Sequence, residues 1–394
     1  MRSLLDTVKA RNAGLAAAEA GQRVSLRFDP GAWVQTKITR SFSKRSPRRV
    51  GQLLSIVALI GMGASPSFAN KKPFKPDSGS VTVRSIEVSS RAIRHFHRDG
   101  TARPIVGKLR WRGGLILSST DTAFGGYSGL TLSPDGKSLI AVSDAGTWLS
   151  ADLSYKKGRL FGLHKARIGP LLALKNRKLT RRRDRDAESI RLLKGNLKYG
   201  TALVSFEVNQ RIGFFDIRGG RLGGPSRYLR PGRGLFRNKG LESVALLSGK
   251  KSRRDVIAFA ERSLDSNGHH RGWIWKNLKA PGRPVALRNL DGFDITDAAG
   301  LENGDLLVLE RRFRWSEGVK MRVRHIKAKT LQPGAILNGK TLVRADMRYE
   351  IDNMEGLAVH KDPAGKTVIT LISDNNFNTF LQRTVLLQFE LLSK

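Results

Sequence analysis

The sequence predicts an all-β protein that folds as a β-propeller, and a repeat along the chain is the first observation behind this prediction. Five times a run of apolar residues ends on a carboxylate, and a short step of acidic or small residues precedes each run. Successive steps lie 60, 54, 55 and 58 residues apart, a period that is typical of propeller blades. The steps begin at Ser128, Glu188, Glu242, Asp297 and Glu355, and the runs end at Asp144, Glu207, Glu261, Glu310 and Asp374.

The strand pattern inside each repeat is the second observation. The first strand is short, as at 130–132 and 357–359, and turn residues such as Pro134-Asp135-Gly136 follow it. The second strand is almost wholly apolar, which favours burial on both faces between neighbouring blades. The outer strands alternate, and Trp273, Trp275 and Trp315 are expected to fill the widening gap between blades.

The predicted number of blades depends on the strand sequences near the two ends of residues 81–394. Five repeats run from Ser128 onward, and residues 81–119 contain further strand sequence. A sixth blade could combine these residues with C-terminal strands, which would close the ring and remove two exposed edges. We therefore predict six blades over residues 81–394, with five as the alternative.

The N-terminal region predicts export. Residues 1–69 form a leader whose apolar core, 51–64, follows a basic segment and precedes the small residues Ser67 and Ala69. This is the pattern of a secretory signal, and cleavage would leave Asn70 first; a retained anchor is the alternative. Residues 70–80 are rich in Lys, Pro and Ser and are expected to be a linker. We expect a periplasmic or secreted protein with no transmembrane span after removal of the signal.

Composition narrows the classes of partner. The 394 residues contain no Cys, which excludes disulfides and Cys-ligated metal or redox sites. The net charge of +38 raises the local concentration of anions, so the expected partner is an anionic small molecule such as a phosphate ester. Solubility alone is the other explanation of the charge. Nucleic acid is not expected, because a basic and aromatic reading surface is missing from the pattern. We expect a monomer.

The carboxylates of the repeat are predicted to meet at one mouth of the central channel. Glu188 to Glu207, Glu242 to Glu261 and Glu355 to Asp374 each span 19 residues, so one hairpin brings both ends to the same face. Two such charges ~4 Å apart repel by about 4 kcal/mol at an effective dielectric of ~20, so the ring requires cations. Oxygen ligands without His or Cys favour Ca²⁺, or Mg²⁺ with several waters. The predicted metal ligands are Glu188, Glu207, Glu242, Glu261, Asp297, Glu310, Glu355 and Asp374.

Arginine residues next to these carboxylates leave an alternative open. They could neutralise the acids as salt bridges, or they could clamp phosphate oxygens bidentately. The predicted substrate-binding residues are Arg211, Arg262, Arg311 and Asn375, the last from the loop after Asp374. The chain has no nucleophile elbow and no phosphate-binding loop, which disfavours triad and phosphate-loop chemistry.

Several short motifs carry a resemblance to a known family. They are Gly126–Leu130, Ser133–Gly136, Asp186–Ile190, Gly240–Ser243, Phe259–Arg262, Asp352–Leu357 and Ser373–Phe377. Through them the chain, from about Ser80 to its C-terminus, resembles the phytase-like domain family (esterase-like activity of phytase) of exported bacterial proteins. That family is named after the alkaline β-propeller phytases, which are six-bladed and calcium-dependent.

The resemblance implies a set of catalytic residues. In the alkaline phytases, Glu residues in Glu-Gly-hydrophobic steps hold Ca²⁺ near the substrate phosphate. By that likeness Glu188, Glu242 and Glu355 are the catalytic residues, although only Glu355 keeps the following Gly, and Ser128 and Asp297 depart from Glu. We therefore predict an exported propeller hydrolase that cleaves phosphoric esters with the help of Ca²⁺. The alternatives are a non-catalytic envelope propeller that binds an anionic glycan, lipid or protein, and a Ca²⁺-dependent lactonase or carboxylesterase.

Overall fold

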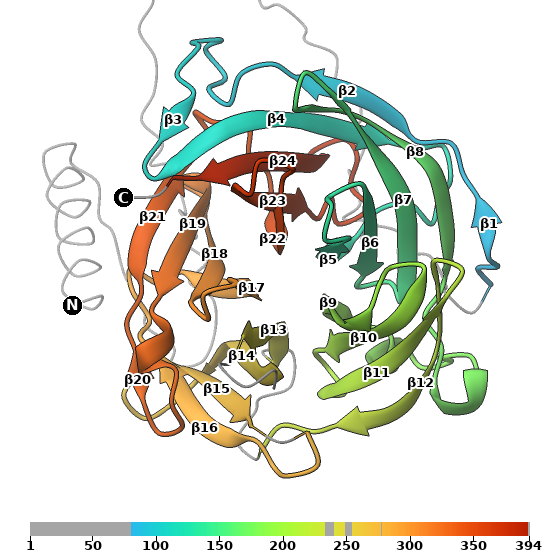
Figure 1. Cartoon of the computed structure of the whole chain (residues 1–394), viewed down its shortest axis with the longest axis vertical. Coiled ribbons are helices and arrows are strands. Elements are labelled where there is room, and N and C mark those ends of the chain that lie inside the picture. Colours follow the sequence, from blue (N-terminus) through green and yellow to red (C-terminus); the bar gives the residue numbers. More distant parts are fainter. Residues whose placement is uncertain (1–79, 233–239, 249–253, 277, 393–394) are drawn as a thin grey trace, which may run out of the picture. The chain divides into compact units, whose positions relative to one another are not determined.

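Five sheets surround a central axis in the computed structural model and form a five-bladed β-propeller (Figure 1). The structure describes residues 80–232, 240–248, 254–276 and 278–392, all of which belong to the unit Phe68–Lys394. The predicted leader, 1–69 with its core at 51–64, and the linker up to residue 79 lie outside the described residues. Within the described ranges, no helix combines the length and the apolar character that a membrane span needs.

The second blade comes from one consecutive stretch of chain, and the first adds a short earlier strand to such a stretch; the innermost strand of each is wholly or largely buried. The first blade contains, from the outside inward, β1 (Arg84–Ser85), β8 (Arg159–Pro170), β7 (Thr147–Lys156), β6 (Ser138–Ser143) and β5 (Tyr127–Leu132). The second contains β12 (Arg221–Leu229), β11 (Arg211–Arg218), β10 (Tyr199–Phe206) and β9 (Ala187–Gly195). The connection between the blades holds two short 3₁₀ helices, η1 (Leu174–Asn176) and η2 (Arg182–Asp184).

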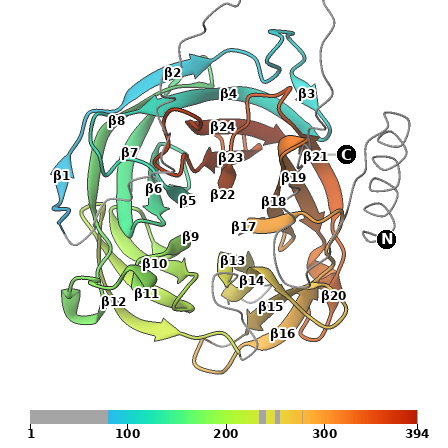
Figure 2. The ribbon, with the colours of Figure 1, turned by 180° about the vertical axis from the view of Figure 1, so that it is seen from behind.

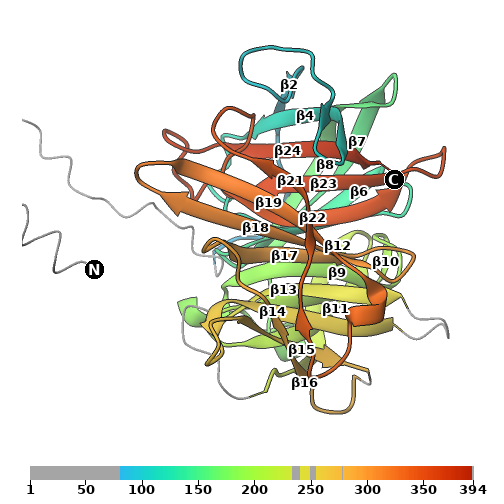
Figure 3. The same ribbon diagram turned by 90° about the vertical axis from the view of Figure 1, so that its left-hand side faces the viewer.

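The third and fourth blades follow the same inner-to-outer order. The third contains β13 (Leu241–Ser248), β14 (Arg254–Leu264), β15 (His270–Trp275), β16 (Arg283–Leu287) and, in parallel at its edge, β20 (Ile336–Leu337). The fourth contains β17 (Asp294–Gly300), β18 (Leu306–Arg314), β19 (Gly318–Ile326) and β21 (Lys340–Ala345), with η3 (Ala328–Thr330) after β19. The fourth blade faces the viewer in Figure 3.

The fifth blade combines both ends of the described chain. Its inner strands are β22 (Met354–Lys361), β23 (Thr367–Ser373) and β24 (Thr384–Leu391), and its outer strands are β4 (Leu109–Ser118), β2 (Ser89–Ile93) and the short β3 (Ile105–Val106). β4 pairs with β24 in both views of the ring (Figures 1 and 2). The prediction that the ends mix in one blade is confirmed, but the predicted count of six is wrong and the alternative of five is right. The N-terminal strands complete the last repeat instead of starting another blade.

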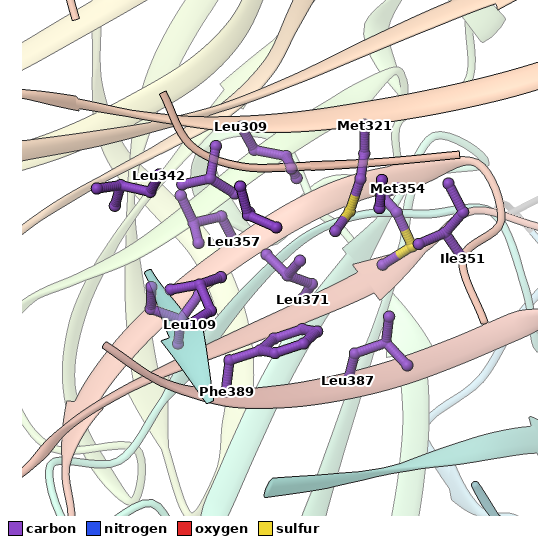
Figure 4. Close-up of a cluster of buried hydrophobic side chains, with 14 of the residues drawn as sticks. Leu109, Leu309, Met321, Leu342, Ile351, Met354, Leu357, Leu371, Leu387 and Phe389 are labelled. Atoms are coloured by element: carbon purple, nitrogen blue, oxygen red, sulfur yellow. The ribbon is translucent and has the colours of Figure 1, made fainter. Parts of the chain in front are cut away.

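Apolar side chains fill the spaces between blades. Figure 4 shows such a cluster between the fourth and fifth blades, where Leu309 and Met321 pack with Leu357 and Leu371. Each large apolar side chain buried in this way contributes about 1.5–3 kcal/mol. Trp273 and Trp275 are buried against the second blade, as predicted. The same prediction is wrong for Trp315, which lies on the turn after β18 and is 95% exposed.

A buried ion pair crosses the axis of the propeller. Arg191 of β9 reaches Asp297 of β17 at 2.6 Å and donates to the backbone carbonyls of Ala298 (2.6 Å) and Leu130 (3.0 Å). Asp297 also accepts the backbone N–H of Leu357 at 2.7 Å. These contacts join four of the five blades at the centre of the ring.

Candidate functional site

A β-bulge near the start of each innermost strand defines the site. Near the start of every innermost strand the register slips at one residue, which the partner strand leaves unpaired. A bulge redirects the side chain of the extra residue, and bulges are common beside active sites. The five bulge positions are Ser128, Glu188, Glu242, Thr296 and Glu355.

A second ring of equivalent residues follows the partner strands. In the first, second, third and fifth blades, the backbone N–H of this residue donates to the carbonyl two residues before the bulge, at 2.9–3.0 Å. The hydrogen bond fixes the end of the second strand beside the start of the first. These strand-end positions are Asp144, Glu207, Glu261, Arg311 and Asp374, the fourth by its pairing with Asp294.

Carboxylate oxygens from different blades converge at this end of the channel. Oxygens of Asp186, Glu188 and Glu207 lie within 4.8 Å of one another, and so do those of Glu207, Glu242 and Glu261. Glu207 belongs to both groups, so the two are continuous. Asp144 and Glu355 act electrostatically on Glu188 as well. We call these seven residues the acidic mouth: Asp144, Asp186, Glu188, Glu207, Glu242, Glu261 and Glu355.

Folding raises the pKa of four carboxylates in the acidic mouth. Burial, together with Asp186 and Asp144, raises the pKa of Glu188 well above its usual value. Burial and the neighbouring Glu188 do the same to the pKa of Glu242. Burial and Asp186 raise the pKa of Glu207 to about 7. Burial also raises the pKa of Glu355 to about 7, although Arg311 opposes the shift. The cause throughout is charge that lacks solvent and faces like charge.

Arg311 is a basic side chain placed inside the acidic mouth. Its Nε lies 3.3 Å from Glu355 Oε1, and its Nη2 lies 3.6 Å from Glu261 Oε1. Its Nη1 donates to Asn353 Oδ1 at 2.7 Å. The carboxylates raise the pKa of Arg311, although burial opposes this. Among the residues that the structure describes, carboxylates outnumber this guanidinium at the mouth.

Two predicted metal ligands belong elsewhere, which corrects the prediction. Asp297 lies one residue past the bulge position Thr296 and is held by Arg191 on the axis. Glu310 lies one residue before the strand-end position Arg311, is fully buried, and binds Arg322 (2.6 Å) and Arg324. The sequence alignment of the fourth repeat was therefore one residue out of register at both steps, because its inner hairpin is shorter than the others.

The predicted ligand Asp374 occupies its strand-end position and is buried. Its Oδ1 accepts the backbone N–H of Asn376 at 2.6 Å, an interaction that shapes the loop after β23. The structure thus brings Glu188, Glu207, Glu242, Glu261 and Glu355 together in one cluster and holds Asp374 at the equivalent place in the fifth blade.

The predicted substrate-binding residues divide in the same way. Arg311 lies in the acidic mouth. Arg211 is buried, stacks on Phe206 with its guanidinium carbon 3.9 Å from the ring centre, and donates to the carbonyl of Asp184 at 2.5 Å. Arg262 pairs with Asp294. These contacts give Arg211 and Arg262 partners within the fold, and their role in substrate binding stays a prediction.

Asn375 also has a structural role. Its Oδ1 accepts the backbone N–H groups of Gly126 and Phe377, both at 3.1 Å, and so ties the fifth blade to the first. Gly126 has a φ of +66°, and a Cβ there would lie 2.5 Å from Asp144 Oδ1. Glycine is therefore required for the close approach of Asp144 to the mouth.

The sequence prediction missed Asp144 and Asp186 as members of the cluster. Asp144 ends the first apolar run, so the repeat itself carried the signal. Asp186 lies two residues before the bulge position, where the other described blades have Gly126, Gly240, Asp294 and Asn353. Because the residue type at this position differs from blade to blade, the repeat did not point to Asp186.

Three comparisons place the chain among known proteins. The model of the Phytase-like family, described as esterase-like activity of phytase, matches residues 122–377, a segment that contains the whole acidic mouth. A comparison with curated proteins finds no match. Among solved structures the chain is similar to the endo-arabinase from Bacteroides thetaiotaomicron VPI-5482, with 12% sequence identity and a TM-score of 0.43. That similarity covers 69% of this chain and 96% of that one.

Proposed function

Because the chain belongs to the Phytase-like family, a family of propeller hydrolase type, we propose that it hydrolyses phosphoric esters at the acidic mouth with the help of a divalent cation, Ca²⁺. The observation that carries the proposal is the convergence of carboxylates from the first, second, third and fifth blades on one end of the channel. Buried acids at this density are unfavourable unless a cation or a proton neutralises them.

The donor set fits Ca²⁺. Ca²⁺ takes oxygen ligands at 2.3–2.6 Å, so two ligands of one ion lie at most about 5 Å apart. The oxygens of Asp186, Glu188 and Glu207 satisfy this limit, as do those of Glu207, Glu242 and Glu261. Two ions that share Glu207 would therefore be held by residues of the second and third blades. A bound Ca²⁺ would supply positive charge that attracts phosphate oxygens and polarises the ester.

The protein's own residues would orient the ester. Once cations neutralise the carboxylates, the guanidinium of Arg311 is available to bind a phosphate oxygen at the same mouth. Ser128 and Thr296 leave the first and fourth blades without a carboxylate at the bulge position. Their sides of the mouth repel an anion least, so we expect the ester to enter there.

The predicted export and monomeric state complete the proposal. An exported enzyme works where Ca²⁺ is plentiful, which suits a site made of oxygen ligands alone. N-terminal sequencing of the mature protein, with Asn70 expected as its first residue, tests this part by itself.

The deciding experiment measures phosphate release by the purified protein from phytate and from p-nitrophenyl phosphate, with Ca²⁺ and with a chelator. We expect turnover with Ca²⁺, its loss with chelator, and a decrease of at least tenfold in Glu188→Gln and Glu242→Gln. The matched control is Asp216→Asn, a partly exposed carboxylate on the outer strand β11, and it should retain activity. Absence of metal-dependent turnover by the wild-type protein would reject the proposal.

A second candidate is a non-catalytic propeller that binds an anionic glycan through bridging Ca²⁺. It is favoured by two aromatic side chains on loops at the same end as the acidic mouth, Trp315 (95% exposed) and Phe380 (93% exposed). Aromatic rings supply a large, rigid contact area at low conformational cost, which suits stacking on a sugar ring. Calcium-dependent retention on alginate, lost in Trp315→Ala and without hydrolysis of any ester, would favour this candidate.

A further inference from the structure

Two adjoining cavities lie at the end of the propeller opposite the acidic mouth. The central cavity, about 440 Å³, lies where the innermost strands end, beyond the Arg191–Asp297 pair. The lateral cavity, about 870 Å³, lies between the fourth and fifth blades. The two share Leu301, Glu302, Lys361 and Thr367 along their common border. A single ligand could therefore occupy both.

The central cavity has an apolar lining. Each blade contributes a hydrophobic side chain to it: Leu132, Leu192, Leu246, Leu301 and Val359. Its guanidinium, that of Arg191, is already neutralised by Asp297. Burial lowers the pKa of His360 to about 4, so this imidazole carries no charge at neutral pH. Such a lining suits a hydrocarbon chain, which gains about 0.8 kcal/mol for each buried methylene group.

The lateral cavity has the opposite character. Five lysines line it, at positions 108, 327, 329, 340 and 361. Lys327 is bound by Asp305 at 3.0 Å, and Lys361 lies 3.7 Å from Glu302. The ammonium groups of Lys108, Lys329 and Lys340 have no acidic partner among the described residues.

The carboxylate of Asp305 cannot neutralise these three lysines. It already binds Lys327, accepts a hydrogen bond from the Ala328 N–H at 2.8 Å and contacts His325 Nε2 at 2.7 Å. The backbone and lysine contacts lower the pKa of Asp305 to about 2 against the effect of burial. The cavity therefore presents uncompensated positive charge directly beside an apolar pocket.

We propose that this end of the propeller binds an amphiphile, with an alkyl chain in the central cavity and an anionic head group, such as a phosphate, among the lysines of the lateral cavity. A bare phosphate would leave the apolar lining in contact with water, and an uncharged alkyl chain would leave the lysines without a partner. Only a molecule with both parts uses both cavities. The site is separate from the acidic mouth and does not depend on its chemistry.

Isothermal titration with decyl phosphate, kept below its micellar concentration, tests the proposal on the full-length protein. We expect one site, with at least tenfold weaker binding of inorganic phosphate and of decyl maltoside, which each carry one half of the ligand.

Lys329→Ala/Lys340→Ala should weaken the binding of decyl phosphate about tenfold through the head group. Leu192→Asn/Leu246→Asn should weaken it through the chain; because both leucines also pack against apolar core clusters, a thermal melt checks that this variant folds. Lys329 and Lys340 are exposed. Lys175→Ala, an exposed lysine at the other end, is the control.

The outcomes separate a specific site from general attraction to a basic protein. Equal binding of phosphate and decyl phosphate, or binding that neither double variant weakens, would overturn the proposal, as would no binding at all. Vesicles identify the source of the amphiphile. Binding to phosphatidylglycerol vesicles but not phosphatidylcholine vesicles, reduced in both double variants, supports a membrane lipid. Decyl phosphate binding without vesicle binding supports a free amphiphile.

Discussion

Glu310 in the fourth blade and Glu188 and Glu242 of the acidic mouth are all buried but differ in their partners. Glu310 is fully buried, and both of its oxygens bind arginines, Arg322 at 2.6 Å and Arg324. Glu188 and Glu242 are each 8% exposed, and carboxylates dominate the charges around them. The difference teaches that burial alone does not mark a functional acid. An acid whose counter-charge is built into the chain stabilises the fold, and one surrounded by other acids must keep its proton or bind a cation.

The fourth blade contributes no carboxylate to the ring of bulge and strand-end positions. At its bulge and strand-end positions it carries Thr296 and Arg311, where the second and third blades carry two glutamates each. Arg311 therefore stands between Glu261 of the third blade and Glu355 of the fifth. The ring of acids is interrupted on one side, and an anion can approach a basic group there.

The largest expected effect on stability comes from a substitution of Glu310, the buried carboxylate that binds two arginines. Glu310→Gln removes a charge that two buried arginines share, and an unpaired buried charge costs about 3–5 kcal/mol. We expect the free energy of unfolding, measured in urea, to fall by at least 3 kcal/mol. The control Glu302→Gln, whose side chain is 82% exposed, should change it by less than about 0.5 kcal/mol. An unchanged stability for Glu310→Gln would mean that the arginine pairs contribute nothing.

The next largest effect is the dependence of protein stability on pH, which the carboxylates of the acidic mouth cause. A carboxylate whose pKa is raised by folding keeps its proton in the native state while the unfolded chain has lost it. Stability without metal should therefore fall as the pH rises from about 4.5 to about 7, and then level off. The pKa of about 7 for Glu355 makes this loss on the order of 3 kcal/mol for that group. Urea unfolding in chelator at pH 5 and pH 8 checks it, and greater stability at pH 8 would contradict it.

Calcium should remove that dependence on pH, with an effect of similar or smaller size. An ion present at 100 times its dissociation constant stabilises the native state by about 2.7 kcal/mol. We expect Ca²⁺ to raise the melting temperature at pH 8 and to have little effect at pH 5, where protons occupy the carboxylates. The double variant Glu188→Gln/Glu242→Gln should lose the response, whereas Asp216→Asn should keep it. A Ca²⁺ response that survives in the double variant would place the ion elsewhere.

The sequence predicted the propeller and the end of the channel at which the acids meet, because both follow from one repeat. Short apolar runs at this spacing are typical of inner propeller strands, and a 19-residue hairpin returns to its starting face. The prediction was wrong in the fourth blade, where the sequence departs from the repeat. The fourth hairpin is shorter, so counting to the nearest carboxylate selected Asp297 and Glu310 instead of Thr296 and Arg311.

The partners of the acids could not be predicted from the sequence. Arg191 and Asp297 are 106 positions apart and come from different blades, and nothing in either local pattern connects them. Likewise Arg262 follows Glu261 in the chain but pairs with Asp294, because neighbours along a strand point to opposite faces. Adjacency in sequence therefore gave the wrong partner, and only the closed ring fixes the right one.

The smallest expected effect on stability comes from Glu207→Gln, which tests the repulsion among the carboxylates of the acidic mouth. Glu207 belongs to both groups of converging oxygens, and burial beside Asp186 raises its pKa to about 7. At pH 8.5 in chelator it is charged, so Glu207→Gln should stabilise the protein, by about 1 kcal/mol after screening by solvent at this partly exposed site. At pH 5.5 the native carboxyl already carries a proton, and the substitution should change little. With saturating Ca²⁺ the sign should reverse, because the variant lacks a ligand oxygen. Urea unfolding under the three conditions distinguishes these results, and a Glu207→Gln protein that is less stable in chelator at pH 8.5 would show that this carboxylate already has its counter-charge.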